Sequence, residues 1–227
     1  MQPESADAQA LLLLGGSFDP IHHGHLRAAL DAAAALGVSQ TTLLPAGVPA
    51  LRDPLSATSA QRLAMLNLAV GKDPSLAIDD CELSRAGATY TSQTLRELRE
   101  RWPARSIIFL LGADAFSRLT QWTQWRGLLD LAHLGVMTRP GEDLRPPDDE
   151  AFLLRRCDDP SSIRERPHGY WCSIPVTPLD ISATAIRDLL ATNRSPRFLL
   201  PDTVLNYIHS HQLYRSSSPV DSTSDAF

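Results

Sequence analysis

Three histidines lie within four residues near the start of the chain, in the stretch GGSFDPIHHGHL that occupies residues 15–26. His22 and His25 flank Gly24, and imidazole N–H groups can donate hydrogen bonds to phosphate oxygens. Two glycines open the stretch and allow the backbone to approach a ligand closely. The pattern predicts a phosphate-binding turn that leads from a strand into a helix N-terminus.

A metal site is the main alternative, because three histidines and Asp19 are all metal-ligating residue types. His22 and His23 are neighbours in the chain, however, and their side chains are hard to converge on one ion. The HxxxH spacing of a helical metal site is absent, and the three cysteines are widely separated and form no CxxC pair. We therefore expect no protein-held metal. The sequence also lacks a GxxxxGK[ST] P-loop and a GxGxxG fingerprint.

A turn of this kind needs a strand before it and a helix after it. Residues 10–14 are continuously apolar, which is typical of a buried parallel strand, and helical periodicity runs from Gly24 to Gly37. Further strands are expected at 41–47, 75–83, 106–114, 133–141 and 170–176. Further helices are expected at 59–70 (capped by Thr58 or Ser59), 91–102 (capped by Thr91 or Ser92), 122–132, 150–156, 182–191 and 201–211.

The alternation of strands and helices predicts an α/β fold with a doubly wound, mostly parallel sheet. We expect a single domain at 10–214 with a small C-terminal helical part, a flexible N-terminus at 1–9 and a disordered tail at 215–227. A chain that ends after Tyr214 should then keep its activity. Such sheets bind ligands at the carboxyl ends of their strands, which is where the histidine stretch lies.

Composition narrows the function classes. The chain has 227 residues, 43% hydrophobic and 21% charged, with a net charge of −5, so a nucleic-acid partner is not expected. The cysteine pattern favours a reducing compartment, and neither a signal peptide nor a run long enough to span a membrane is seen. We expect a cytoplasmic protein without a membrane partner, and a homo-oligomer is compatible with the sequence.

A second polar cluster opens the helix expected at 182–191. Ser182, Thr184 and Arg187 place two hydroxyls and a guanidinium at a helix N-terminus, which suits a second phosphate cradle. Without the histidine stretch, this segment would favour a simpler interpretation, an N-cap with Arg187 on a solvated face. Gly112 and Asp114 end the most apolar strand, and Asp114 could contact a ligand or cap the next helix.

The two clusters together resemble a known family. GGSFDPIHHGHL matches the GG[ST]FDPxHxGHL signature of the HxGH nucleotidyltransferases, and ISATAIR at 181–187 resembles their ISSTxIR motif. TYTSQTLRELR at 89–99, the GxDxxxxLxxWxxWxxL-like stretch at 110–129 and VMTRPG at 136–141 are similar to the nicotinate-nucleotide adenylyltransferases. The resemblance covers residues 11–213 apart from 141–170, and it implies their Rossmann-like nucleotidyltransferase fold.

The resemblance implies transfer of the adenylyl group of ATP to nicotinate mononucleotide, with Mg²⁺ accompanying ATP. It implies that His22, His25 and Arg187 are catalytic. It implies that ATP contacts Gly16, Ser17, Phe18, His22, Gly24, His25, Gly112, Asp114, Ile181, Ser182, Thr184 and Arg187. It implies that the mononucleotide contacts Arg52, Thr91, Trp122, Thr123 and Arg139.

Within that second set, Trp122 would stack on the pyridine ring, whereas Trp125 is expected in the core. The chain departs from relatives that read PxxxPPHK after the second strand, since Leu51 and Arg52 replace the His and Lys. Arg52, aided by Arg62, would clamp the acceptor phosphate. Two alternatives stay open: another phosphorylated acceptor, such as nicotinamide mononucleotide or phosphopantetheine, and a catalytically silent nucleotide-binding regulator.

Overall fold

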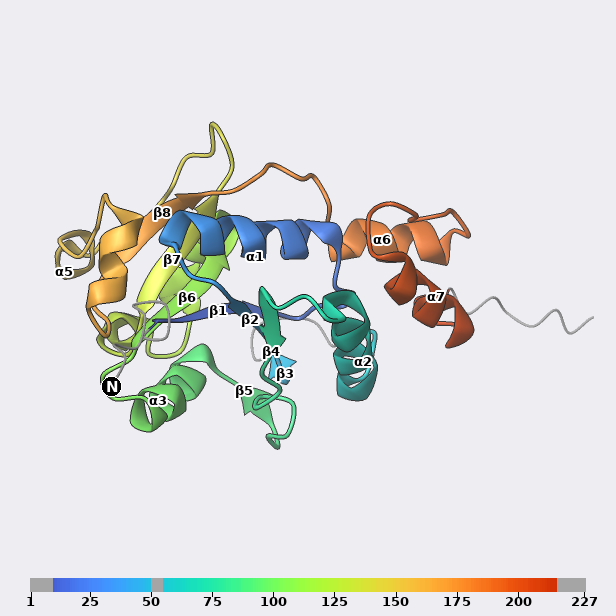
Figure 1. The fold of residues 1–227 in the computed structure, drawn as a ribbon, viewed down its shortest axis with the longest axis horizontal. Helices are drawn as coiled ribbons and strands as arrows, with labels where there is room; N and C mark the ends of the chain where they lie inside the picture. The colour runs from blue at the N-terminus through green and yellow to red at the C-terminus, as the bar shows by residue number, and fades with distance from the viewer. Residues whose placement is uncertain (1–9, 50–54, 216–227) are drawn as a thin grey trace, which may run out of the picture.

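The computed structural model describes residues 10–49 and 55–215, and within them strands and helices alternate as predicted (Figure 1). The strands are β1 (Ala10–Gly16), β2 (Thr41–Pro45), β3 (Val48–Pro49), β4 (Leu76–Ile78), β5 (Ala88–Thr89), β6 (Ser106–Gly112), β7 (His133–Thr138) and β8 (Trp171–Pro175). The α-helices are α1 (His23–Leu36), α2 (Ser59–Val70), α3 (Thr91–Arg101), α4 (Ala113–Ser117), α5 (Glu150–Leu153), α6 (Ala183–Ala191) and α7 (Asp202–Ser210). Short 3₁₀ helices are η2 (Leu119–Gln121), η3 (Trp125–Asp130) and η4 (Pro160–Glu165). The predicted N-terminal segment 1–9 and all of the predicted tail except Arg215 lie outside the described residues.

The main sheet has six strands in the order β4-β2-β1-β6-β7-β8, and every neighbouring pair is parallel. The winding direction changes between β1 and β6, which pair side by side. The carboxyl ends of these two strands therefore form the topological switch point, where doubly wound sheets bind ligands. The predicted doubly wound parallel sheet is confirmed.

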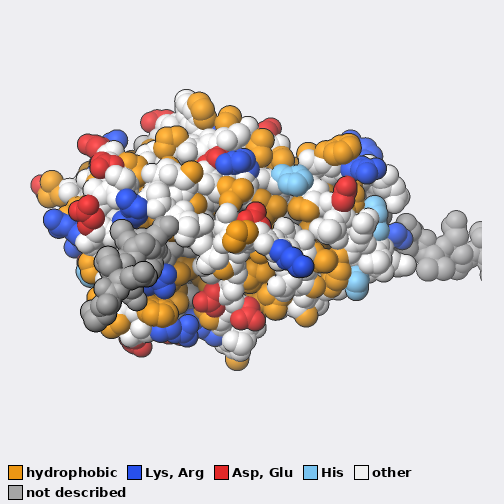
Figure 2. Space-filling view, viewed as in Figure 1, with side chains coloured by type: hydrophobic (Ala, Val, Ile, Leu, Met, Phe, Trp, Pro, Cys, Tyr) orange, Lys and Arg blue, Asp and Glu red, His pale blue; other side chains and the backbone are white. Residues whose placement is uncertain are grey.

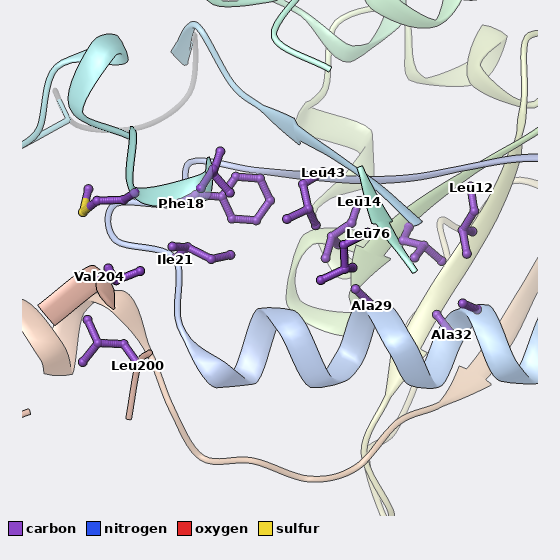
Figure 3. Close-up of a cluster of buried hydrophobic side chains, with 14 of the residues drawn as sticks. Leu12, Leu14, Phe18, Ile21, Ala29, Ala32, Leu43, Leu76, Leu200 and Val204 are labelled. Carbon is purple, nitrogen blue, oxygen red and sulfur yellow. The ribbon is translucent and has the colours of Figure 1, made fainter. Parts of the chain in front are cut away.

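Alternate residues of each central strand enter two separate cores. Leu12 and Leu14 of β1 pack into the core that contains α1, whereas Leu13 packs into the opposite core. Figure 1 shows α1 lying across one face of the sheet and α3 across the other. Figure 3 shows the β1 leucines pointing toward Ala29 and Ala32, whose small side chains let α1 lie close to the sheet. Burial on both faces explains why β1 and β6 are continuously apolar.

The helix ends follow local chemistry, with one exception. Thr58 caps α2 through a reciprocal capping box with Gln61, and Gly37 ends α1 in the left-handed conformation at φ 60°. The expected cap of α3 was wrong, because Tyr90 is the N-cap, without a side-chain hydrogen bond, and Thr91 is already helical.

Two expected elements differ from the structure. The strand expected at 75–83 ends at Ile78, because the Asp79 carboxylate accepts a hydrogen bond from the Cys81 amide at 3.0 Å and turns the chain. The helix expected at 122–132 is only the 3₁₀ helix η3, preceded by Gln124 in the left-handed region at φ 57°. The short parallel pair β3–β5 and the 3₁₀ helix η4 lie in segments where periodicity indicated no element.

The surface carries both signs of charge. Figure 2 shows acidic and basic side chains interspersed over the visible face. None of the described helices is long and apolar enough to cross a membrane.

Candidate active site

The two polar clusters that the sequence places 160 residues apart meet at the switch point. Arg187 of α6 donates a hydrogen bond from Nη1 to the backbone carbonyl of Asp19 at 2.7 Å, across 168 residues of sequence. A cavity of about 860 Å³ opens beside this contact. Ten predicted ATP-site residues line it: Ser17, His22, Gly24, His25, Gly112, Asp114, Ile181, Ser182, Thr184 and Arg187. The remaining two, Gly16 and Phe18, do not.

The two histidines of this cavity form a stacked pair. The ring centroids of His22 and His25 are 3.7 Å apart, with 24° between the planes. His22 is the N-cap residue of α1 and is 5% exposed, and its Nδ1 has no hydrogen-bond partner among the described residues. Burial, and secondarily the charge of His23, lowers the pKa of His22 to about 4. His22 is therefore neutral at physiological pH and meets a ligand as a hydrogen-bonding group rather than as a cation.

The packing of this pair leaves little room for a side chain at position 24. A Cβ atom at Gly24 would lie 3.0 Å from Nδ1 of His22 and 3.4 Å from the carbonyl oxygen of Ile181. The backbone of α1 thus passes between the first histidine and the loop that leads into α6. This close approach leaves the first turn of α1 open to the cavity.

The turn before the histidines is held by two guanidinium groups. Arg62 of α2 donates to the carbonyl of Ser17 at 2.8 Å, and Arg187 donates to the carbonyl of Asp19. Phe18 lies between them with a left-handed backbone, φ 48°, and its side chain is fully buried. Figure 3 shows Phe18 and Ile21 within the apolar cluster that reaches α7. Only the backbone of Phe18 remains to contact a ligand.

The expected role of Arg62 at the acceptor phosphate was wrong. Its side chain is 1% exposed and donates to Ser17, to the carbonyl of Gly47 at 3.3 Å and to Oγ of Ser59 at 3.3 Å. A guanidinium that serves two backbone carbonyls inside the protein holds loops together and is not available to substrate. Arg52, the other basic residue of that hypothesis, lies outside the described residues.

The N-terminus of α6 combines a cap with a ligand-facing surface. Oγ of Ser182 accepts a hydrogen bond from the amide of Ala185 at 3.1 Å, so the cap interpretation is confirmed. Arg187 is half-buried rather than on a solvated face, because Nη1 donates to Asp19, while Nη2 donates to Oγ1 of Thr184 at 3.3 Å. Both hydroxyls and the guanidinium nevertheless line the cavity. Their spacing lets them approach phosphate oxygens while Arg187 keeps its contact to Asp19.

A second cavity, of about 460 Å³, lies on the other side of the β1 and β6 strand ends. Gly16 and three predicted mononucleotide residues, Thr91, Trp122 and Thr123, line it. The two cavities share Leu14, Ser17, His25, Gly112 and Met137. A ligand in one cavity can therefore meet a ligand in the other beside His25.

The tryptophans divide as expected. Trp122 is half-buried, lines the second cavity and meets Phe109 edge to face, with ring centroids 6.4 Å apart. Trp125 is 8% exposed and packs against Phe152 in the core. Arg139 was expected to contact the mononucleotide, but it lines the first cavity instead. It directly follows β7, which ends at Thr138.

Asp114 does not cap the helix that follows β6. The N-cap of α4 is Gly112, and Asp114 lies in the first helical turn with its side chain at the first cavity. Among the described residues, no three His, Cys, Asp or Glu side chains gather in an arrangement that could hold a metal ion.

Two acidic residues at the site were not among the predicted ATP or mononucleotide contacts, and Asp19 was considered only as a possible metal ligand. Asp19 is 2% exposed and binds backbone amides of the segment before α2. Glu82 is 6% exposed at the second cavity, where it accepts a hydrogen bond from Oγ1 of Thr94 at 2.6 Å. For Asp19, the sequence signal that could have indicated a site residue was its position inside the histidine stretch. Glu82 lies in a segment that was expected to be a strand, and nothing in the sequence there indicated a site residue.

Comparisons with known proteins agree with this geometry. A family model described as cytidylyltransferase-like matches residues 13–189. A probable nicotinate-nucleotide adenylyltransferase of Acidithiobacillus ferrooxidans is 44% identical over 213 residues, covering 91% of this chain and 96% of the relative. One of Marinobacter nauticus is 43% identical over 92% of this chain and 98% of its own length.

Solved structures show the same fold. Plasmodium falciparum nicotinic acid mononucleotide adenylyltransferase in complex with NaAD has a TM-score of 0.68, with 19% identity, over 91% of this chain and 97% of its own. The same enzyme in complex with APC has a TM-score of 0.67 with 20% identity, again over 91% and 97% of the two chains. The family match and the relatives above 40% identity cover most of the chain. The chain therefore belongs to the cytidylyltransferase-like family and, within it, to the nicotinate-nucleotide adenylyltransferases.

Proposed function

We propose that the protein transfers the adenylyl group of ATP to nicotinate mononucleotide, releasing pyrophosphate and forming nicotinate adenine dinucleotide. One observation carries the proposal: two cavities, one rich in phosphate-binding groups and one with a tryptophan wall, share a border at Ser17, His25 and Gly112. Two phosphate-bearing substrates bound on either side would bring their phosphates together there.

The chemistry needs little from the protein beyond position and charge. The mononucleotide phosphate is already an anion at neutral pH, so it can attack the α-phosphorus of ATP without a general base. Catalysis then consists of holding two polyanions in line and stabilising the charge that develops on the α-phosphoryl group and on pyrophosphate. No dyad of nucleophile and base is required for such a step.

We assign the triphosphate to the first cavity. His22, His25 and Arg187 would donate to its oxygens, with Ser182 and Thr184 beside them and the N-termini of α1 and α6 facing the same space. The neutral imidazole of His22 suits this task, because it donates a hydrogen bond without the desolvation cost of a buried cation. Removal of one such donor typically costs about a hundredfold in turnover.

Mg²⁺ belongs to this proposal as part of the ATP substrate. It would be held by phosphate oxygens and water, as Mg²⁺ usually is at nucleotide sites. Its charge would neutralise the leaving pyrophosphate.

We assign the mononucleotide to the second cavity, with its pyridine ring against Trp122 and its carboxylate near the backbone at Thr91. Backbone N–H groups alone can prefer an acid over an amide, because a carboxylate only accepts hydrogen bonds whereas an amide also donates. The acceptor phosphate would lie toward the border with the first cavity.

The test is turnover. The protein is mixed with ATP, Mg²⁺ and nicotinate mononucleotide, and pyrophosphate and the dinucleotide are quantified, with nicotinamide mononucleotide and phosphopantetheine in parallel. We expect product with the nicotinate acceptor and at least tenfold less with either alternative, a preference of about 1.4 kcal/mol. Equal use of the amide would refute the acceptor assignment, and ATP binding without turnover on any acceptor would indicate a silent regulator.

A further inference from the structure

The carboxylate of Asp19 is a buried junction between parts of the chain that surround the first cavity. Its Oδ2 accepts a hydrogen bond from the amide of Ser56 at 2.7 Å, and its Oδ1 accepts one from the amide of Ala57 at 3.1 Å. Its backbone carbonyl receives Arg187. Asp19 thus connects the turn before the histidines with the segment entering α2 and with the guanidinium of α6.

A third donor to this carboxylate comes from the far end of the fold. The hydroxyl of Tyr214 donates to Oδ1 of Asp19 at 2.6 Å, across 195 residues of sequence. The distance is short, as expected for a hydrogen bond to a charged acceptor. Tyr214 lines neither cavity, and its hydrogen bond to the site is the one to Asp19.

The chain adopts unfavourable backbone conformations to place this hydroxyl. After α7 ends at Ser210, Gln212 has φ 53° and Tyr214 has φ 61°, both in the left-handed region that residues other than glycine rarely occupy. Strain of this kind persists only where surrounding contacts over-determine it, and here the specific polar contact is the one to Asp19.

The surroundings keep Tyr214 in the donating form. Burial, reinforced by its hydrogen bond to Asp19, raises the pKa of the hydroxyl above its ordinary value. Arg62 interacts electrostatically with both Asp19 and Tyr214, and Arg187 interacts with Tyr214. The carboxylate thus accepts hydrogen bonds from three donors, with the Arg62 guanidinium nearby.

We propose that Tyr214 is a positioning residue for adenylyl transfer, which fixes the Asp19 carboxylate and thereby sets Arg187, Leu55 and Ser56 at the wall of the first cavity. The inference rests on the proposed function. Leu55, Ser56 and Arg187 all line that cavity, so a rotation of Asp19 would displace cavity wall on two sides. Catalysis that depends on in-line geometry is sensitive to such displacements.

The substitution Tyr214→Phe removes only the hydroxyl and keeps the ring, which packs against the α1 core. We expect kcat to fall about tenfold and KM for ATP to rise, the scale for losing one hydrogen bond to a charged group. The melting temperature should change by only a few degrees. The matched control is Tyr170→Phe, which removes a hydroxyl that accepts from Arg166 at 2.8 Å just before β8, at the amino-terminal edge of the sheet. Its kinetics should match those of the wild type.

A double-mutant cycle separates positioning from general stability. If Tyr214 acts through Asp19 on Arg187, then Arg187→Ala should reduce kcat/KM at least fivefold less in the Tyr214→Phe background than in the wild-type background. If the fold-losses in kcat/KM of the two single variants simply multiplied in the double variant, the proposal would be overturned. Wild-type kinetics of Tyr214→Phe would also overturn it, as would an equal loss of activity in Tyr170→Phe.

The outcome can be separated from that of the proposed function. If the wild-type protein makes no dinucleotide, the adenylyl-transfer assignment fails irrespective of Tyr214. Calorimetric titration with Mg²⁺-ATP alone then tests the positioning effect, with weaker binding expected for Tyr214→Phe and unchanged binding for Tyr170→Phe. Unchanged ATP binding by Tyr214→Phe in that case overturns the positioning role.

Discussion

The sharpest test of the histidine site is the addition of one methyl group at Gly24. In Gly24→Ala the new Cβ would lie 3.0 Å from Nδ1 and 3.1 Å from Cε1 of His22, closer than ordinary van der Waals contact. The imidazole must yield by a few tenths of an ångström. It cannot simply swing away, because its ring is stacked 3.7 Å from that of His25 and is 5% exposed.

The expected result is a loss of activity without a loss of fold. Replacing a helical glycine by alanine favours the helix by at most about 1 kcal/mol, which offsets much of the steric cost. Displacement of a phosphate-binding ring, by contrast, can cost on the order of a hundredfold in rate. We therefore expect kcat/KM to fall about a hundredfold while the melting temperature changes by only a few degrees.

The assay is pyrophosphate release with saturating nicotinate mononucleotide and varied Mg²⁺-ATP, paired with thermal unfolding. Gly127→Ala in η3 is the matched control, since a Cβ there meets nothing within 4 Å. It should leave both measurements unchanged. A Gly24→Ala variant with kcat/KM within threefold of the wild type would refute the role of this close approach, and so would a loss explained entirely by unfolding.

Three further predictions concern neighbouring residues. His25→Ala should reduce kcat about a hundredfold or more with an unchanged circular dichroism spectrum, and near-normal turnover would remove His25 from the mechanism. Trp122→Ala should raise KM for the mononucleotide with little effect on stability. Trp125→Ala should instead lower the free energy of unfolding by about 3 kcal/mol, as measured by urea titration. If Trp125→Ala raised KM and Trp122→Ala lowered the stability, the two assignments would be reversed. Burial lowers the pKa of His22 and of His133 to about 4, so unfolding takes up protons below about pH 6.5. The free energy of unfolding should therefore fall as pH falls from 6.5 to 4, by up to about 3 kcal/mol for each histidine, and a flat urea midpoint across that range would contradict it.

Elements with strong local signals were predictable. The apolar run of β1, the periodic helix that ends at Gly37 and the capping box at Thr58 are each specified by residues within a few positions of one another. Elements with weak local signals were not. η3 has the apolar spacing of a helix, but the left-handed Gln124 before it limits it to a single 3₁₀ segment. The pair β3–β5 is two residues long on each side and has no periodicity to detect.

The residues of the candidate site also fall into those with a strong local sequence signal and those without one. The histidine stretch and the ISATAIR segment carry their chemistry in contiguous residues, so the sequence alone indicated which groups line the first cavity and at which helix N-termini they lie. The alternation of strands and helices likewise indicated the parallel sheet and the edge at which the two cavities open.

Only the tertiary structure decided how these parts support one another. Arg62 looked like a surface phosphate clamp, but its partners are 45 and 15 residues away in sequence and bury it beneath the glycine turn. Tyr214 carried no signal at all, because its partner Asp19 is 195 residues away. Local patterns report the preferences of neighbouring residues, whereas these contacts exist only after the chain has folded and has brought distant segments within hydrogen-bonding distance.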